Sequence, residues 1–248
     1  MIKFVVFCTK IMITIVLALL FTSCNPKFDF GDGIDGDGNV TTEKRSISGD
    51  FTKIDVSRGL NVELEQSKSY FVEVEADENL QQHITTKVEN GTLIITSDEN
   101  IDEAVSRTIR VKMPLITSLE TSSGSIVSGK NIFLGSDLKV RTSSGSEIDI
   151  EAEVDTIDCE STSGSTISIK GKALKLTTAS SSGSNINAEK LMANEIITEA
   201  TSGSSTDIYP IVSLKAKASS GSSVNYKNSP KKTLTKEESS GGSVSQEN

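Results

Sequence analysis

Among the residues that could take part in a chemical reaction, serine is the one that this sequence repeats most regularly. Ser-Gly-Ser occurs six times and a Ser-Gly-Gly variant follows near the C-terminus, centred on Gly124, Gly145, Gly164, Gly183, Gly203, Gly221 and Gly241. A serine hydroxyl becomes a nucleophile only beside a general base, most often a histidine. The single histidine of the chain, His83, lies outside the repeats. The pattern therefore predicts no catalytic serine, and we expect no enzyme activity.

Residues that could bind a metal are equally sparse. Asp35, Asp37 and Asn39 have the spacing that begins a calcium loop. Such a loop needs glycine at its sixth place and a carboxylate at its twelfth, and these places hold Val40 and Ser46. A lone histidine without a neighbouring cysteine does not make a zinc or copper site. We expect neither a metal nor another cofactor.

The N-terminus has the pattern of a secretory signal. Lys3 and Lys10 precede an apolar stretch from Ile11 to Phe21. A membrane-spanning helix needs about 20 apolar residues, and this stretch is much shorter. We therefore interpret residues 1–23 as a cleaved signal peptide and exclude them from the fold.

The residues that end this stretch, Phe21-Thr22-Ser23-Cys24, resemble the lipobox of bacterial lipoproteins. The resemblance implies cleavage before Cys24, diacylglycerol on its thiol and an acyl chain such as palmitate on its amino group. Two or more acyl chains hold a protein stably on a bilayer. No aspartate follows Cys24, so the resemblance implies an outer-membrane lipoprotein, with surface or periplasmic orientation left open. An ordinary signal peptide that contains a cysteine is the alternative.

Charge and cysteine count limit the partners and the covalent framework. The formal net charge is −9, and an acidic chain repels nucleic acid. Once the signal is removed and Cys24 is lipidated, Cys159 remains alone, so no disulfide can form within the chain. We expect Cys159 to be a small buried apolar residue. Residues 24–45, rich in glycine and aspartate, are predicted to be a flexible acidic tether.

The elements that would position any site are β-strands. Between residues 46 and 113, apolar and polar residues alternate, the pattern of strands with one buried face. Asn90-Gly91 stands between two such runs and predicts a hairpin, because both residues tolerate positive φ. No segment shows a helical period.

Residues 114–248 repeat with a period of about 20 residues. When the repeats are aligned on their central glycines, odd offsets are mostly apolar and even offsets mostly polar. Two columns, seven residues before and three residues after each glycine, are apolar in six of their seven residues. They are Thr117, Leu138, Ile157, Leu176, Ile196, Leu214 and Leu234, and Val127, Ile148, Ile167, Ile186, Thr206, Val224 and Val244. Side chains that alternate in this way point to opposite faces of a strand.

A repeat of this length cannot bury its apolar side alone, but stacked coils can. We therefore predict an all-β, single-domain parallel β-helix-like solenoid over residues 46–248, with an N-terminal strand and hairpin region at 46–113 and Ser-Gly-Ser coils at 114–248. The triplet would turn the chain between the strands of each coil. Both of its serines are expected to line the inside of that corner. Valine at Gly164 should then cost more stability than valine at Ser168.

A polar column four residues after the glycines is the candidate binding face. We select Asp149, Asn187, Asp207 and Asn225 because they share this offset. Outward polar side chains at one coil position would stack into a continuous row. A glycan or a surface protein is the expected partner.

Several stretches in order resemble a known family. They are FTKIDVSRGLNVELEQ, YFVEVEADENL, KVENGTLIIT, RVKMPLITSLETSSGS and the serial SGS coils that end in SSGGSV. Together they are similar to the putative auto-transporter adhesin, head GIN domain family, over roughly residues 46–248. The resemblance implies a β-helix-like fold and an adhesin role, and it supplies no catalytic residues. A polysaccharide-acting enzyme and a periplasm-facing envelope scaffold remain the alternatives.

Overall fold

The computed structural model describes residues 33–247. The predicted signal peptide and lipidation site, residues 1–23 and Cys24, lie outside the described residues. Residues 34–248 form one compact unit. Among the residues described, no helix is long and apolar enough to cross a membrane.

The N-terminal region is a set of short strands, as the alternation predicts. Its one helical turn is a 3₁₀ turn at Glu78–Leu80. The strands are β1 (Val40–Lys44), β2 (Lys53–Val56), β3 (Asn61–Gln66), β4 (Phe71–Asp77), β5 (Ile84–Glu89), β6 (Thr92–Ser97) and β7 (Arg107–Met113). The predicted hairpin is confirmed, because β5 and β6 pair antiparallel and Asn90 and Gly91 both have positive φ.

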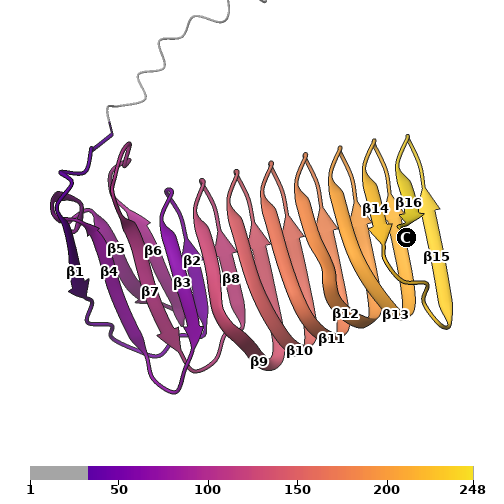
Figure 1. The fold of residues 1–248 in the computed structure, drawn as a ribbon, viewed down its shortest axis with the longest axis horizontal. Helices are drawn as coiled ribbons and strands as arrows, with labels where there is room; N and C mark the ends of the chain where they lie inside the picture. The colour runs from indigo at the N-terminus through magenta and orange to yellow at the C-terminus, as the bar shows by residue number, and fades with distance from the viewer. Residues whose placement is uncertain (1–32, 248) are drawn as a thin grey trace, which may run out of the picture. The chain divides into compact units, whose positions relative to one another are not determined.

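The repeats form strands that pair in parallel with the next coil, and the longest of them, β9 to β13, bend midway. These strands are β8 (Ser118–Thr121), β9 (Ile126–Thr142), β10 (Glu147–Ser161), β11 (Thr166–Ser180), β12 (Asn185–Ala200), β13 (Ser205–Ala218), β14 (Ser223–Tyr226), β15 (Thr233–Glu238) and β16 (Ser243–Gln246). They make a solenoid of about six turns. Figure 1 shows the coils following one another, with their turn tips in a row.

Strands far apart in the sequence meet at the start of this stack. β2 pairs in parallel with both β6 and β8, and β3 pairs in parallel with both β7 and β9. The coil made by β2 and β3 therefore lies between β6–β7 and β8–β9, although it precedes β6 in the chain. The solenoid thus begins before the first Ser-Gly-Ser triplet.

The core runs through the coils as the aligned columns predict. Val127, Ile148, Ile167, Ile186 and Val224 are fully buried. Burial of each such aliphatic side chain contributes roughly 1.5–3 kcal/mol. The exception is Leu234 in the last coil, which is 43% exposed because no further coil covers it.

The predicted flexible tether is wrong for its C-terminal part. Val40–Lys44 forms β1 and pairs antiparallel with β4, and Ile34 bridges Ile101. The buried Asp77 carboxylate fixes this segment, since it accepts N–H bonds from Gly38 at 3.1 Å and from Ser106 at 3.0 Å. Burial raises the pKa of Asp77, but the backbone donors outweigh this effect and lower the pKa overall.

Each Ser-Gly pair forms a tight turn, in which the serine and the glycine both have positive φ. At Ser163-Gly164 the φ angles are 54° and 70°, the signature of a type I′ turn. The Ser165 N–H donates to the Thr162 carbonyl at 3.3 Å and closes the turn. The Gly164 N–H donates to the Ser182 carbonyl of the next tip at 3.1 Å, so the tips are themselves hydrogen-bonded into a row.

The prediction that both serines line the corner is wrong for the first of them. The second serine, such as Ser165 or Ser184, is buried, whereas Ser163 is exposed. A left-handed residue at the second place of the turn points away from the two strands, so the simple alternation of faces fails there. Inside, the Ser165 hydroxyl lies 2.7 Å from the Thr162 carbonyl and 2.9 Å from the Thr142 hydroxyl.

Candidate binding surface

The four selected residues lie in one row across consecutive coils. Asp207 pairs in register with Asn187 on one side and with Asn225 on the other. Asp149 reaches them through Ser168, which is in register with both Asp149 and Asn187. We call the complete row the polar ladder: Ser128, Asp149, Ser168, Asn187, Asp207, Asn225 and Ser245.

Hydrogen bonds connect the C-terminal part of the polar ladder. Asn225 Nδ2 donates to Asp207 Oδ1 at 2.9 Å, and the Ser245 hydroxyl donates to Asn225 Oδ1 at 3.0 Å. Asn187 Oδ1 accepts the Glu189 N–H at 3.3 Å. Asp149 is exposed and the other three selected residues are half-buried. These bonds hold the side chains of Asn187, Asp207 and Asn225 in fixed orientations.

Opposite charges also pair between coils beside the polar ladder. Lys170 Nζ lies 3.2 Å from Glu151, and Lys227 Nζ lies 2.7 Å from Glu247. The hydrogen bond to Glu247 raises the pKa of Lys227. Such exposed pairs contribute little stability and are screened by salt. They neutralise the charges of Glu151 and Glu247 locally.

A second row of charged residues lies on the other arm of the coils, which is the part of each strand that precedes the Ser-Gly turn. Two acidic residues of this row contact one arginine. Arg141 Nε donates to Glu160 at 3.1 Å, and its Nη1 lies 3.8 Å from Glu120. The hydrogen bond to Glu160 raises the pKa of Arg141. Beyond Glu120 in the same row, burial and the Glu120 charge together raise the pKa of Asp55.

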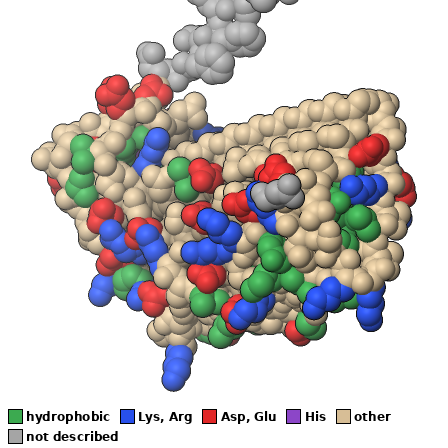
Figure 2. Space-filling view, turned by 45° about the vertical axis from the view of Figure 1, so that its right-hand side comes forward, with side chains coloured by type: hydrophobic (Ala, Val, Ile, Leu, Met, Phe, Trp, Pro, Cys, Tyr) green, Lys and Arg blue, Asp and Glu red, His purple; other side chains and the backbone are tan. Residues whose placement is uncertain are grey.

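Along most of the row of turn tips, the exposed side chains carry hydroxyl groups and none is charged. Figure 2 shows a tan ridge along the tips, and the charged and hydrophobic side chains of the coils on this face lie below that ridge. The exposed residues at the tips are serines, from Ser123 to Ser240.

The described residues contain no cluster of side chains that could bind a metal ion. No group of three or more histidine, cysteine or acidic side chains within residues 33–247 could hold a metal ion. His83 Nδ1 lies 2.9 Å from Asp98 in a surface pair. Cys159 is buried as predicted, and burial raises the pKa of its thiol, so the reactive thiolate is disfavoured.

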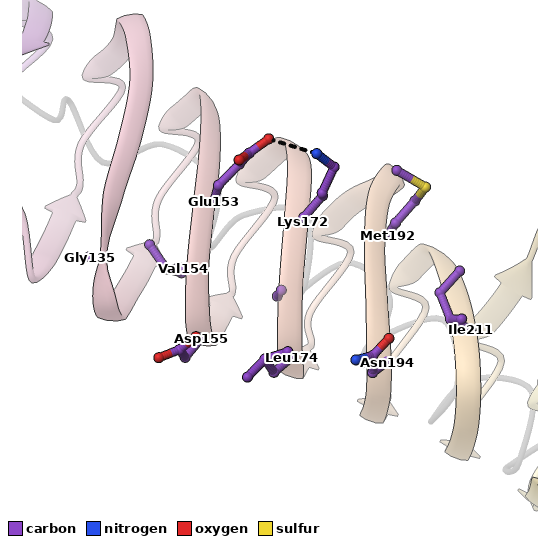
Figure 3. A pocket seen from close by; sticks show the side chains of 10 residues that line it. Gly135, Glu153, Val154, Asp155, Lys172, Leu174, Met192, Asn194 and Ile211 are labelled. Carbon is purple, nitrogen blue, oxygen red and sulfur yellow. Dashed lines mark hydrogen bonds and ion pairs between the residues drawn. The ribbon is translucent and has the colours of Figure 1, made fainter.

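A pocket at the bend of the coils was not predicted from the sequence. We call it the bend pocket; its volume is about 420 Å³, and it is lined by Gly135 of β9, Glu153, Val154 and Asp155 of β10, Lys172, Ala173 and Leu174 of β11, Met192 and Asn194 of β12, and Ile211 of β13. In Figure 3, Glu153, Lys172 and Met192 lie along one side, and Asp155, Leu174 and Asn194 along the other. Lys172 Nζ and Glu153 are 3.1 Å apart.

One signal in the sequence could have located this bend. The strict alternation stops at Asp155 and Thr156, where two polar residues stand between the apolar Val154 and Ile157. Two outward residues in succession require the strand to change direction, which is what β10 does. This break does not show in columns aligned on the glycines, because each column contains residues of a single offset.

The chain matches a described protein family over residues 50–230: "Putative auto-transporter adhesin, head GIN domain". This range contains the N-terminal strands from β2 onward and all but the last of the Ser-Gly turns. No curated protein matches the chain.

Solved structures share this fold. A putative adhesin from Bacteroides fragilis superposes with a TM-score of 0.81 at 19% identity, covering 87% of this chain and 100% of that chain. A putative lipid binding protein from Parabacteroides distasonis has a TM-score of 0.72 at 20% identity, with 87% and 99% covered. A putative adhesin from Parabacteroides merdae has a TM-score of 0.70 at 19% identity, with 88% and 100% covered. At these identities the likeness establishes the fold alone.

Proposed function

Because the chain belongs to the family described as putative auto-transporter adhesin, head GIN domain, we propose that it is a lipid-anchored envelope protein that binds a partner and catalyses no reaction. The observation that carries this proposal is the polar ladder, a continuous row of outward amides, carboxylates and hydroxyls on a rigid stacked sheet. Solenoids use such extended faces for binding. The partner is a glycan or a protein on another cell surface.

The lipid anchor is supported by the sequence at Cys24. Its test is metabolic labelling of cells with a palmitate analogue, followed by purification of the full chain. The label should be present in the natural chain and absent from Cys24→Ala. A chain that is secreted and unlabelled would show that the segment is an ordinary signal peptide.

The orientation of the anchored protein separates an adhesin from an internal scaffold. Intact cells that carry the full chain are treated with a protease too large to cross the outer membrane. A surface adhesin is degraded, and an outward-facing chain is also reached by an antibody. Survival of the protein in intact cells, with degradation only after lysis, would instead favour a periplasm-facing scaffold.

The binding face is tested by a fourfold variant, Asp149→Ala, Asn187→Ala, Asp207→Ala and Asn225→Ala. The full chain is screened on arrays of glycans and of bacterial surface proteins, and retained partners are titrated against both forms. We expect the variant to lose affinity at least tenfold. A matched control replaces Glu120 and Glu160 on the other arm, where affinity should persist.

The same screen tests for an enzyme. Uronic-acid polymers and neutral polysaccharides are incubated with the full chain, with and without calcium. The proposal expects no shortened products. Catalytic release of oligosaccharides would overturn the non-catalytic assignment.

A further inference from the structure

We propose that the bend pocket binds a neutral, linear glycan that lies across the coils. This inference rests on the proposed binding function but places the ligand at a different site from the polar ladder. It concerns Glu153–Asp155 of β10, Lys172–Leu174 of β11, Met192 and Asn194 of β12, and Ile211 of β13.

The bend pocket crosses several coils because the register keeps equivalent residues aligned. Val154 is in register with Ala173, and Ala173 with Ala193. Val154 and Ala173 are each only 7% exposed, so they form the base of the pocket. Small side chains at this column leave a depression in consecutive coils spaced about 4.8 Å apart. A ligand that fits one coil can therefore continue onto the next.

The sides of the bend pocket combine aliphatic and polar groups. Leu174 is 56% exposed and Met192 is 44% exposed, so both present apolar surface to a ligand in the pocket. The Asp155 carboxylate and the Asn194 amide flank Leu174 on the same side. Within the described residues no hydrogen bond or ion pair engages either group, so both can bond to a ligand. A sugar ring matches this mixture, because its C–H face is apolar and its rim carries hydroxyls.

Other ligand classes fit less well. An acyl chain would remove water from Asp155, Asn194 and Lys172 without replacing those hydrogen bonds, which is costly. An extended peptide binds best at a bare sheet edge, and the backbone here is already paired on both sides.

Charge favours a neutral polymer. Glu153 and Asp155 bring two negative charges, and the single lysine is held by Glu153 at 3.1 Å. An acidic glycan would therefore meet unbalanced carboxylates on a chain whose net charge is −9.

The experiment uses the purified full chain and arrays of neutral fragments (glucans, mannans and xylans) beside acidic ones such as polygalacturonate and hyaluronan. The fragment with the strongest signal is then titrated by calorimetry. Leu174→Ala and Asn194→Ala should each weaken binding at least tenfold. Both side chains are on the surface, so these variants should keep the thermal stability of the natural chain.

Two matched controls separate the pocket from general surface effects. Leu234→Ala removes a leucine of similar exposure from β15 and should bind normally. Ala173→Leu fills the base of the bend pocket and should abolish binding, whereas Ala179→Leu adds the same group to an exposed site on the same strand and should not.

Each outcome decides the inference. Loss of neutral-glycan binding in the pocket variants alone supports it. If the pocket variants bind normally and the fourfold polar-ladder variant does not, the inference is overturned while the proposed binding function stands. Stronger binding of acidic than of neutral glycans, or retention of proteins alone on the array of surface proteins, also overturns it. A chain that retains no partner on any array refutes the inference and the proposed function together.

Discussion

Replacement of Gly171 by alanine should damage the solenoid more than the same change at a repeated turn glycine. Gly171 lies inside β11 with φ of +120°, and a Cβ there would overlap the carbonyl oxygen of Ala152 in the preceding coil. The backbone strain costs roughly 1–3 kcal/mol. Displacement of packed backbone adds roughly another 1–3 kcal/mol. We expect a total near 4 kcal/mol.

Alanine at Gly164 would add backbone strain without a steric overlap, so this variant measures the strain by itself. Its φ is +70°, and a Cβ would meet no atom within 4 Å. Gly164→Ala should therefore cost only about 1–2 kcal/mol. Gly135→Ala is the matched control, because its φ is not positive and its Cβ would make ordinary contacts at 3.6 and 4.0 Å with Leu115 and Val154. That variant should be nearly neutral.

Differential scanning calorimetry of the full chain measures the effect. A loss of 1 kcal/mol lowers Tm by about 2–4 °C in a protein of this size, so we expect roughly 8–16 °C for Gly171→Ala and 2–8 °C for Gly164→Ala. Equal shifts for the two variants would refute the close contact between β10 and β11. A larger shift at Gly164 would show that the turn tips, and not the coil interior, limit stability.

Four further predictions concern stability and reactivity. Gly164→Val should lower Tm more than Ser168→Val, because only Gly164 requires a left-handed backbone; equal shifts would count against the turn. Asp77→Asn should destabilise the protein at pH 7 and flatten its acid transition in urea titrations, because the lowered pKa of Asp77 contributes stability above about pH 4 that is lost as the carboxyl protonates. Cys159 should resist thiol labelling, read by peptide mass spectrometry, until the chain unfolds. Its raised pKa keeps the folded thiol neutral, so stability should fall above about pH 8.5, where the unfolded thiol ionises. Arg141→Met should change the free energy of unfolding by less than about 1 kcal/mol. The salt dependence that the Arg141 ion pairs give to this free energy should be absent from the variant. A larger loss of stability would mean that the charged row supports the fold.

The polar ladder and the bend pocket differ in how far the sequence predicts them. The polar ladder could be predicted, because Asp149, Asn187, Asp207 and Asn225 share one offset and parallel register keeps equal offsets together. The bend pocket could not, because its shape depends on where β10, β11 and β12 change direction. Residues aligned by their offsets show which side chains share a face, but they do not show the angle at which a strand bends.

The sequence by itself determined the coil, its period and its buried face. Alternating apolar residues and the glycine at each turn act locally, within one 20-residue repeat. Their structural effects can therefore be predicted from the sequence alone. It also set the hairpin at Asn90-Gly91, since two residues with positive φ suffice for that turn.

Only the tertiary structure decided how the N-terminal strands join the stack. The insertion of β2 and β3 between β6–β7 and β8–β9, and the docking of β1 on β4, join segments separated by tens of residues. Such pairings depend on which exposed edges and apolar faces remain available after the local coils have formed. The outward direction of the first serine in each triplet has a local origin instead, because a left-handed residue at the second place of the turn points away from both strands.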